Sequence, residues 1–245
     1  MDLSAYLRWA RVERGLSPAT IEAYTRELHT LASGSERLHE LQTDDLRAVL
    51  HARGGAPSTV ARRLAAWRSY YGWLVRTGQR DDDPTRGIDR PRVRRGIPRP
   101  VEDLDALLGR LDPVMQAVVV FLAETGLRVS EACSVSERLP APETITVLGK
   151  GGKERHVPLS DLARAALDEL GGHIPLAKRT VQRRLQLAGS KAHALRHTFA
   201  SDLAEDDVDI SVIQKLLGHA SPATTLIYAE VSQRRMRAAI DRRRR

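Results

Sequence analysis

Hydrophobic positions recur at three- and four-residue intervals through the first third of the chain. The recurrence places apolar side chains on one face of a helix and charged ones on the other. Ser17-Pro18 and Pro57-Ser58 supply typical helix starts. Four amphipathic helices are expected, at residues 4–11, 19–31, 43–50 and 59–74. The pattern predicts a helical bundle over residues 1–83.

The helical pattern stops between residues 81 and 100. This stretch, DDDPTRGIDRPRVRRGIPRP, contains four prolines and six arginines. Proline lacks a backbone donor and restricts the residue before it, so neither a helix nor a central strand suits this composition. We expect a basic linker over residues 84–100.

Residues 101–245 return to helical spacing, with one exception. Residues 143–159 alternate apolar and polar positions around a glycine-rich turn at Gly149–Gly152, which predicts a β hairpin. Helices are expected at 101–111, 113–126, 161–170, 178–188, 191–204, 208–217 and 222–231. The predicted fold class is mainly α with two domains: a helical bundle, and a mixed α/β domain that is mostly helical with a small hairpin or sheet.

Charge adds a function class to this picture. The formal net charge is +8, with five lysines against thirty-four arginines. One guanidinium group can donate two parallel hydrogen bonds to two oxygens of a phosphate. The excess of arginine therefore favours a nucleic-acid partner. Arginine enrichment from a GC-rich coding genome explains the same numbers equally well.

Cysteine content and hydropathy bear on the compartment. Cys133 is the single cysteine, which rules out an intramolecular disulfide. The longest apolar run, 117–123, is too short to span a bilayer, and the N-terminus carries charges where a secretory signal would be apolar. We expect a soluble cytoplasmic protein, of a bacterial cell or a phage host, with no membrane partner.

Several basic residues stand at the expected ends of elements. Arg128, in TGLRVSEA, follows the helix-ending Gly126 and precedes an N-cap candidate at Ser130. Lys150 lies on the glycine-flanked hairpin tip, with Lys153 close behind it. Such positions let side chains reach a ligand, although each is also common in purely structural roles.

Two later segments add histidines and a tyrosine. In HALRH, His193 and Arg196 share one helical face, and His197 is expected to turn away from it. Two histidines at this spacing lack the third ligand of a metal site. In KLLGHASPATTLIYAEV, Gly218 ends a helix before His219, and the next helix carries Tyr228.

Taken in order, these pieces resemble the tyrosine recombinase family, which includes phage integrases and Xer recombinases. The pieces are TGLRVSEA, GKGGKERHVPL, HALRHTFA, LLGH and a tyrosine nine residues later. LSPATIEAYTRELHTL and STVARRLAAWRSYYGWL, followed by DPTRGI, resemble the family's core-binding domain. The resemblance implies a core-binding domain at 1–83, a catalytic domain with a C-terminal tail at 101–245, and a short form without an N-terminal arm-binding domain.

The resemblance also implies roles for six residues. Arg128 and Arg196 would clamp the scissile phosphate, and Tyr228 would attack it. Lys150 would protonate the departing 5′ oxygen, with Lys153 left open as the alternative. His193 and His219 would bind phosphate and handle protons. His193 follows Lys150 by only 43 residues, which departs from the longer insert of many relatives.

The chemistry is consistent with this residue set. In-line attack on a phosphodiester builds negative charge on its oxygens, and fixed guanidinium groups with an imidazole stabilise that charge without a metal. A phosphotyrosine preserves the energy of the broken bond, so rejoining needs no ATP. We therefore expect no cofactor.

The expected partner is double-stranded DNA carrying inverted-repeat core sites, bound by a homotetramer on two sites. A host DNA-bending or directionality factor is a further expected partner. The tail after Tyr228, with Val231, Met236 and Ile240, is expected to dock on a neighbouring protomer or on its own domain. Candidate DNA contacts are Ser58, Thr59, Arg62, Arg63, Arg179, Gln182, Arg183 and Arg184.

Four functions fit these motifs. The short catalytic region favours a phage or mobile-element integrase. An Xer-type resolvase of replicon dimers carries the same motifs. A DNA-binding regulator without catalysis would keep the basic faces but lose part of the residue set, and a type IB topoisomerase would act on one duplex without any sequence requirement.

Overall fold

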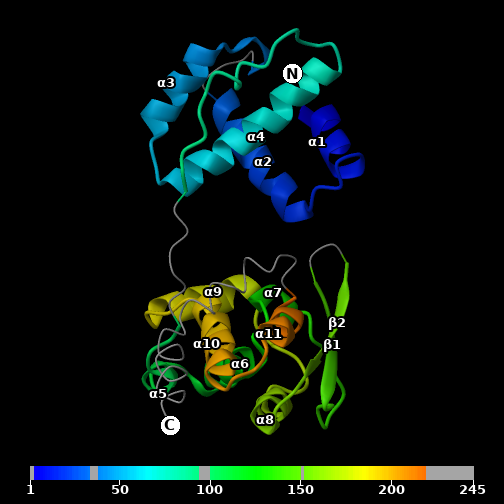
Figure 1. Ribbon diagram of the computed structural model, residues 1–245, viewed down its shortest axis with the longest axis vertical. Helices are drawn as coiled ribbons and strands as arrows, with labels where there is room; N and C mark the ends of the chain where they lie inside the picture. Colours follow the sequence, from blue (N-terminus) through cyan, green and yellow to red (C-terminus); the bar gives the residue numbers. More distant parts are fainter. Residues whose placement is uncertain (1–2, 34–37, 94–99, 150–151, 219–245) are drawn as a thin grey trace, which may run out of the picture. The chain divides into compact units, whose positions relative to one another are not determined.

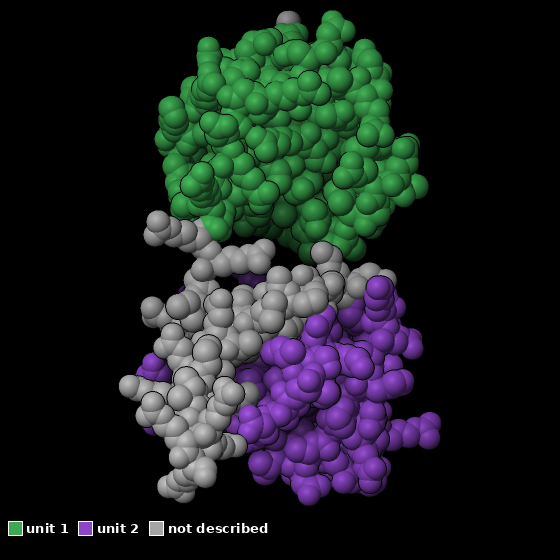
Figure 2. Space-filling model, in the orientation of Figure 1, with its two compact units in different colours: residues 1–95 green, residues 96–245 purple. Residues whose placement is uncertain are grey.

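The structure divides into two compact units. It is a computed structural model that describes residues 3–33, 38–93, 100–149 and 152–218. The units comprise residues 1–95 and 96–245 (Figures 1 and 2).

The first unit is a helical bundle, as predicted. Pro18 opens the second helix, and the Ser17 hydroxyl accepts a hydrogen bond from the Thr20 amide at 3.3 Å, so the sequence signal is used as a cap. The elements are α1 (Leu3–Val12), α2 (Pro18–Ala32), the 3₁₀ turn η1 (Leu38–Glu40), α3 (Thr43–Arg53) and α4 (Pro57–Arg76) (Figure 1).

Aromatic side chains form much of the core of this unit. The Tyr6 ring of α1 meets the Tyr70 ring of α4 edge-on, with centroids 5.3 Å apart, and lies 5.7 Å from the Trp73 ring. Trp67 is fully buried beside them. The Tyr71 hydroxyl donates to the Leu38 carbonyl at 2.7 Å. Such ring pairs stabilise beyond the area they bury, so α1 and η1 are fixed to α4.

The first unit continues past α4 to residue 88. The Thr43 hydroxyl donates to the Pro84 carbonyl at 2.9 Å, and Arg47 Nη2 donates to the Gly87 carbonyl at 2.7 Å. Ile88 is 7% exposed and belongs to the core. The stretch predicted as linker from residue 84 therefore begins with residues that fold onto the bundle, because Ile88 gives them an apolar anchor.

The second unit is built around one apolar helix. Helix α6 has eight buried residues, and it packs against α8 and α10. A helix that is hydrophobic all round belongs in a core. The elements are α5 (Leu104–Leu108), α6 (Pro113–Thr125), α7 (Val129–Ala132), β1 (Thr144–Leu148), β2 (Glu154–Pro158), α8 (Asp161–Glu169), α9 (Lys178–Leu187), α10 (Ala192–Glu205) and α11 (Ile210–Leu217) (Figure 1).

The predicted hairpin is confirmed as a two-stranded antiparallel sheet within the described residues. Thr144 pairs with Pro158 at one end of the register and Leu148 with Glu154 at the other. Alternate residues face inward, with Ile145 buried on β1 as the alternation requires. Strand β2 lies against α11. The fold class is thus mainly helical with a small sheet, as expected.

Cys133 ends α7 and is half-buried. Its thiol donates to the Leu176 carbonyl at 3.6 Å, which joins the end of α7 to the segment before α9. Burial raises the pKa of the Cys133 thiol. None of the helices in the described ranges is long and apolar enough to cross a bilayer.

Candidate active site

The site begins where α6 ends. Gly126 closes the helix in the left-handed conformation, at φ +60°, as predicted. Arg128 then caps α7: its amide donates to Glu131 Oε2 at 2.9 Å, and its Nη1 donates to Glu131 Oε1 at 2.7 Å. Ser130 was the expected cap and that expectation is wrong, because the Glu131 carboxylate reaches back to the Arg128 amide and starts the helix there.

Arg155 of β2 also binds the Glu131 carboxylate. Its Nη2 donates to Oε2 at 2.9 Å and its Nη1 to Oε1 at 3.2 Å. Its Nε donates to the Leu216 carbonyl of α11 at 2.9 Å. One guanidinium thus connects β2, α7 and α11. Neither Arg155 nor Glu131 was a predicted site residue, although both stand inside the quoted motifs GKGGKERHVPL and TGLRVSEA.

Arg196 of α10 lies beneath the same carboxylate and is 1% exposed. Its Nη1 donates to the Gly126 carbonyl at 2.8 Å, and its Nη2 to the Leu217 carbonyl at 2.5 Å. Nη1 also lies 3.9 Å from Glu131 Oε2. A buried charge needs such partners. The structure therefore brings Arg128 and Arg196, the two predicted clamp residues, to a shared carboxylate.

The charges at this point do not balance. Burial alone would raise the pKa of Glu131, but hydrogen bonds from Arg155 and Arg128 outweigh it and hold that pKa at about 2. Glu131 is consequently ionised at neutral pH, and three guanidinium groups surround its single negative charge. The local excess is positive, which suits a site for a phosphate group.

His193 and His197 form a second cluster in the first two turns of α10. Their rings lie 4.7 Å apart at 75°. The expectation that His197 turns away is therefore wrong, because residues four apart on a helix are neighbours. Within the described ranges, no three His, Cys, Asp or Glu side chains gather in a way that could hold a metal ion.

Both imidazoles are shifted toward the neutral form. Burial lowers the pKa of His193, and the charges of Arg196 and Arg128 lower it further. Burial lowers the pKa of His197 to about 4, with help from His193 and Arg196. A neutral imidazole has one donor and one acceptor nitrogen. His193 can thus donate a hydrogen bond or accept a proton beside the arginines.

Three predicted site residues fall outside the described residues. They are Lys150, His219 and Tyr228, and the predicted helix at 222–231 and the tail after it fall outside as well. Lys153 is described and exposed, and its carbonyl accepts from the Gly149 amide at 2.7 Å across the hairpin turn. Gly218 ends α11 at φ +63°, as predicted. The choice between Lys150 and Lys153 stays open.

The candidate DNA contacts at the start of α4 separate into two groups. Ser58 and Arg62 are exposed and Thr59 is half-buried. The Arg62 guanidinium lies 3.3 Å from Glu27, in a pair that is exposed enough on the arginine side to exchange for a phosphate. Arg63 is 8% exposed, donates to the Gly54 carbonyl at 2.5 Å and lies 3.5 Å from Glu27. Arg63 is committed to the fold of its unit, so we remove it from the proposed contacts.

The candidates on α9 divide in the same way. Arg179, Gln182 and Arg183 are exposed on this helix, with no hydrogen bond or ion pair to other described side chains. Arg184 Nη1 lies 2.7 Å from Asp112 Oδ2. This surface pair is weak enough to exchange for a phosphate. The exposed face of α9 therefore offers two unpaired arginines and an amide.

Comparison with known proteins covers nearly the whole chain. Residues 3–78 match the phage integrase N-terminal SAM-like domain, and residues 175–235 match the phage integrase family. Tyrosine recombinase XerD of Rhizobium meliloti strain 1021 is 32% identical over 96% of this chain and 92% of its own. Tyrosine recombinase XerC of Xanthomonas campestris pv. campestris strain B100 is 35% identical over 92% and 83%.

The fold has matching solved structures. A lambda integrase dimer bound to a COC′ core site aligns with a TM-score of 0.76 at 18% identity, over 93% of this chain and 77% of that one. That likeness concerns the fold alone, whereas the identity to the two Xer proteins shows the family. This chain belongs to the tyrosine recombinase family of site-specific DNA recombinases.

Proposed function

We propose that this protein cuts and rejoins double-stranded DNA at specific sites through a 3′-phosphotyrosyl intermediate formed by Tyr228. The observation that carries the proposal is the arrangement around Glu131, where Arg128 and Arg196 are fixed within 2.7 and 3.9 Å of its oxygens. Fixed positive charge needs little reorganisation when negative charge develops on a phosphate.

The two arginines would act differently. The Arg128 side chain is 36% exposed and can reach a phosphate from the surface. Arg196 is held rigidly below it by the carbonyls that end α6 and α11. Together they would stabilise the two non-bridging oxygens while the Tyr228 oxygen attacks phosphorus.

Each cleavage step balances without a cofactor. The Tyr228 oxygen forms a bond to phosphorus and loses its proton, which neutral His193 or His219 would accept. The bond from phosphorus to the 5′ oxygen breaks, and Lys150 or Lys153 would protonate that oxygen. Attack by a 5′ hydroxyl of another strand reverses the step and releases Tyr228. Because the phosphodiester is exchanged and not hydrolysed, neither ATP nor a metal is required.

DNA binding would use both units. The first unit would serve as the core-binding domain and the second as the catalytic domain, with Ser58, Thr59 and Arg62 in the first contacting DNA. In the second, exposed α9 would supply Arg179, Gln182 and Arg183. Because recombination exchanges four strands, we propose a homotetramer on two core sites, with two protomers per site. The lambda integrase dimer on one core site is consistent with this count.

The biological role has two candidates. The short stretch between Lys150 and His193 favours an integrase of a phage or mobile element. The XerC and XerD relatives support an Xer-type resolvase of replicon dimers at least as well. A plasmid with two direct copies of one native site, compared with a plasmid that carries two unlike attachment sites, separates the two roles. Excision between identical sites supports the Xer-type role, whereas recombination only between two unlike attachment sites supports the integrase.

A suicide DNA substrate tests the proposed chemistry. A nick placed near the cut lets a short product diffuse away, so the covalent adduct accumulates and the attached peptide can be mapped. We expect the adduct on Tyr228 and none with Tyr228→Phe, which removes only the hydroxyl. DNA binding by the variant should match the wild type, since its charge is unchanged. An adduct formed by the Phe variant would assign the nucleophile elsewhere.

A further inference from the structure

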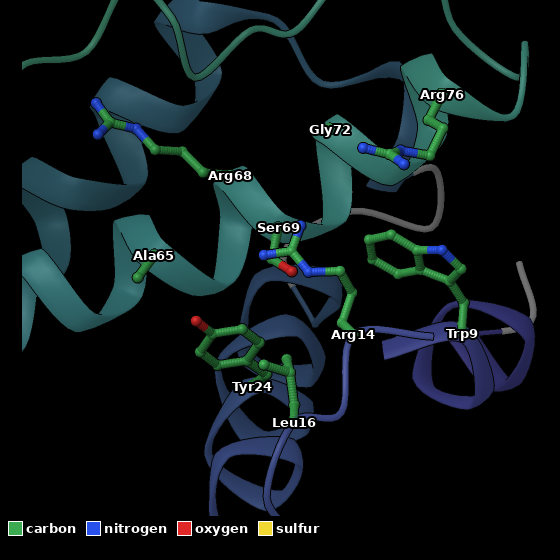
Figure 3. A pocket seen from close by; sticks show the side chains of 9 residues that line it. All are labelled: Trp9, Arg14, Leu16, Tyr24, Ala65, Arg68, Ser69, Gly72 and Arg76. Carbon is green, nitrogen blue, oxygen red and sulfur yellow. The ribbon is translucent and has the colours of Figure 1, made fainter. Parts of the chain in front are cut away.

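A cavity of about 330 Å³ opens on the first unit among α1, α2 and α4 (Figure 3). Trp9 and Arg14 approach it from α1 and the turn after it, Tyr24 from α2, and Gly72 and Arg76 from α4. Its nine lining residues include three arginines and no carboxylate. A water molecule occupies about 30 Å³ of liquid, so the cavity has room for a larger polar group.

Two of the arginines gather at one indole ring. The guanidinium carbons of Arg14 and Arg76 lie 5.7 and 5.9 Å from the centre of the Trp9 ring. Neither side chain has a carboxylate partner among the described residues. The third arginine, Arg68, points away from them and donates to the Ile88 carbonyl at 2.6 Å (Figure 3).

Other arginines of this unit do have carboxylate partners. Arg26 lies 2.8 Å from Glu22, Arg47 lies 2.9 Å from Asp44, and Arg80 lies 2.8 Å from Asp82. Two like charges that share an aromatic neighbour repel each other, and an anion between them would turn that repulsion into attraction. The cavity therefore offers a positive site with no carboxylate in its lining to neutralise it.

Gly72 supplies an independent observation. It lies inside α4, where glycine weakens a helix relative to alanine. A Cβ atom at this position would meet nothing within 4 Å, so packing gives no reason for a glycine. Its missing side chain leaves the helix backbone open beside Arg76 (Figure 3). Close approach of a bulky ligand to a backbone is one of the established uses of glycine.

We propose that this cavity binds a backbone phosphate of double-stranded DNA. Arg14 and Arg76 would bind the phosphate oxygens, and Gly72 would let the DNA backbone approach the backbone of α4. The proposal rests on the proposed function, and it adds a contact that the start of α4 does not provide. A guanidinium matches a phosphate in charge and in the spacing of its donors. Contacts of this kind position a protein on a duplex without reading its sequence.

Salt-dependent binding of a duplex of arbitrary sequence tests the proposal. All variants are made in the full chain with Tyr228→Phe, so that covalent trapping contributes nothing. Each phosphate contact adds about 0.9 to the slope of log K against log salt, which is roughly fivefold in affinity at 0.15 M salt. We expect Arg14→Ala/Arg76→Ala to weaken binding by roughly thirtyfold, from two such contacts, and to lower the slope by nearly 2.

Three comparison variants make the result specific. Arg8→Ala/Arg11→Ala removes the same charge from exposed positions on α1 outside the cavity, and it should lower the slope far less. Arg14→Lys/Arg76→Lys keeps the charge and should keep most of the slope. Gly72→Leu should weaken binding by filling the cavity without lowering Tm, because a Cβ there meets nothing within 4 Å and leucine favours a helix more than glycine does.

Equal slopes for the cavity pair and the Arg8/Arg11 pair would overturn the proposal, as would full affinity of Gly72→Leu. An acidic protein that binds the wild type but not the cavity pair, together with unchanged DNA slopes, would assign the cavity to that partner instead. The measurement involves no strand cleavage. A wild-type protein that shows the expected slopes but never forms an adduct would refute the proposed chemistry and leave the phosphate site standing.

Discussion

The Glu131 carboxylate is the shared partner of Arg128, Arg155 and Arg196. Glu131 is 6% exposed, and its carboxylate accepts hydrogen bonds from Arg128 and Arg155. Arg196 Nη1 lies 3.9 Å from Oε2 of the same carboxylate. Removing one member of a buried ion pair leaves the other charge uncompensated, which is costly. The carboxylate therefore acts as a counter-charge that holds the arginines in position.

This arrangement predicts a pH dependence of stability. The pKa of Glu131 falls from 4.5 to about 2 on folding, so its stabilising contribution is complete above pH 4.5 and is lost as pH falls toward 2. A shift of this size corresponds to a loss on the order of 3 kcal/mol. Glu131→Gln has no carboxylate to protonate and should lack this loss. The difference in free energy of unfolding between the wild type and Glu131→Gln should therefore shrink as pH falls from 4.5 to 2.

Chemical denaturation at pH values from 7 down to 2 measures the effect. Glu102→Gln, at an exposed position of the same unit, serves as the control and should follow the wild-type curve. A wild-type minus Glu131→Gln difference that stays constant across this pH range would show that the carboxylate is not held by the arginines.

Among the elements, the junction of α6 and α7 tolerates little change. Gly126 adopts a positive φ, and a Cβ there would lie 2.3 Å from Cδ1 of Phe199 and 3.0 Å from Cδ2 of Leu217. Alanine in the left-handed region costs about 1–2 kcal/mol, and overpacking adds about 1–3 kcal/mol. We expect Gly126→Ala to lower the free energy of unfolding by about 2–5 kcal/mol.

Gly171→Ala provides the matched control for that substitution. Gly171 also has a positive φ, at +74°, but a Cβ there would meet nothing within 4 Å. It should lose only the conformational part, about 1–2 kcal/mol. Urea denaturation of both variants gives the comparison, and equal losses would mean that the Phe199 contact relaxes without penalty.

Elements governed by local signals could be predicted from the sequence. Periodicity gave the long helices, alternation gave the hairpin, and Gly126 and Gly218 were recognised as helix ends because glycine alone adopts positive φ readily. Ser17 was recognised as a start for the same kind of reason. These features depend on neighbours in the chain.

Features that depend on distant residues could not be predicted in this way. Glu131 and Arg155 are 24 positions apart, and only folding shows that they form an ion pair. The sequence alone places Arg63 among the exposed candidates for DNA contact, whereas in the folded unit it binds Glu27 and the Gly54 carbonyl. His197 is different, because helix geometry already places it beside His193, and the sequence interpretation misjudged that face.

Across the whole molecule, part of the arginine excess is structural. Glu27 in the first unit is 5% exposed and lies 3.2, 3.3 and 3.5 Å from Arg53, Arg62 and Arg63. Glu131 in the second unit is likewise surrounded by three arginines. Each unit thus contains a buried carboxylate with arginines converging on it. Net charge alone therefore overstates the number of arginines available to DNA.

Each unit also has a hydrophobic core of its own. We therefore predict that the first unit folds independently of the second. The aromatic cluster of Tyr6, Tyr70 and Trp73 involves only residues of the first unit. A segment of 95 residues can bury enough surface to fold alone. Residues 1–95 should show a cooperative thermal transition with near-ultraviolet dichroism from the packed rings. A broad transition without that dichroism would show that the first unit needs the second.

The half-buried thiol of Cys133 has a practical consequence for spectroscopy. Thiol reagents attack the thiolate, and burial keeps the Cys133 thiol protonated at neutral pH. Val12 is 73% and Leu187 is 80% exposed, one in each unit. Val12→Cys/Leu187→Cys would therefore accept maleimide dyes well before Cys133. A donor and acceptor attached there would report, by energy transfer, whether the separation of the two units changes when DNA is added, with the native cysteine left in place.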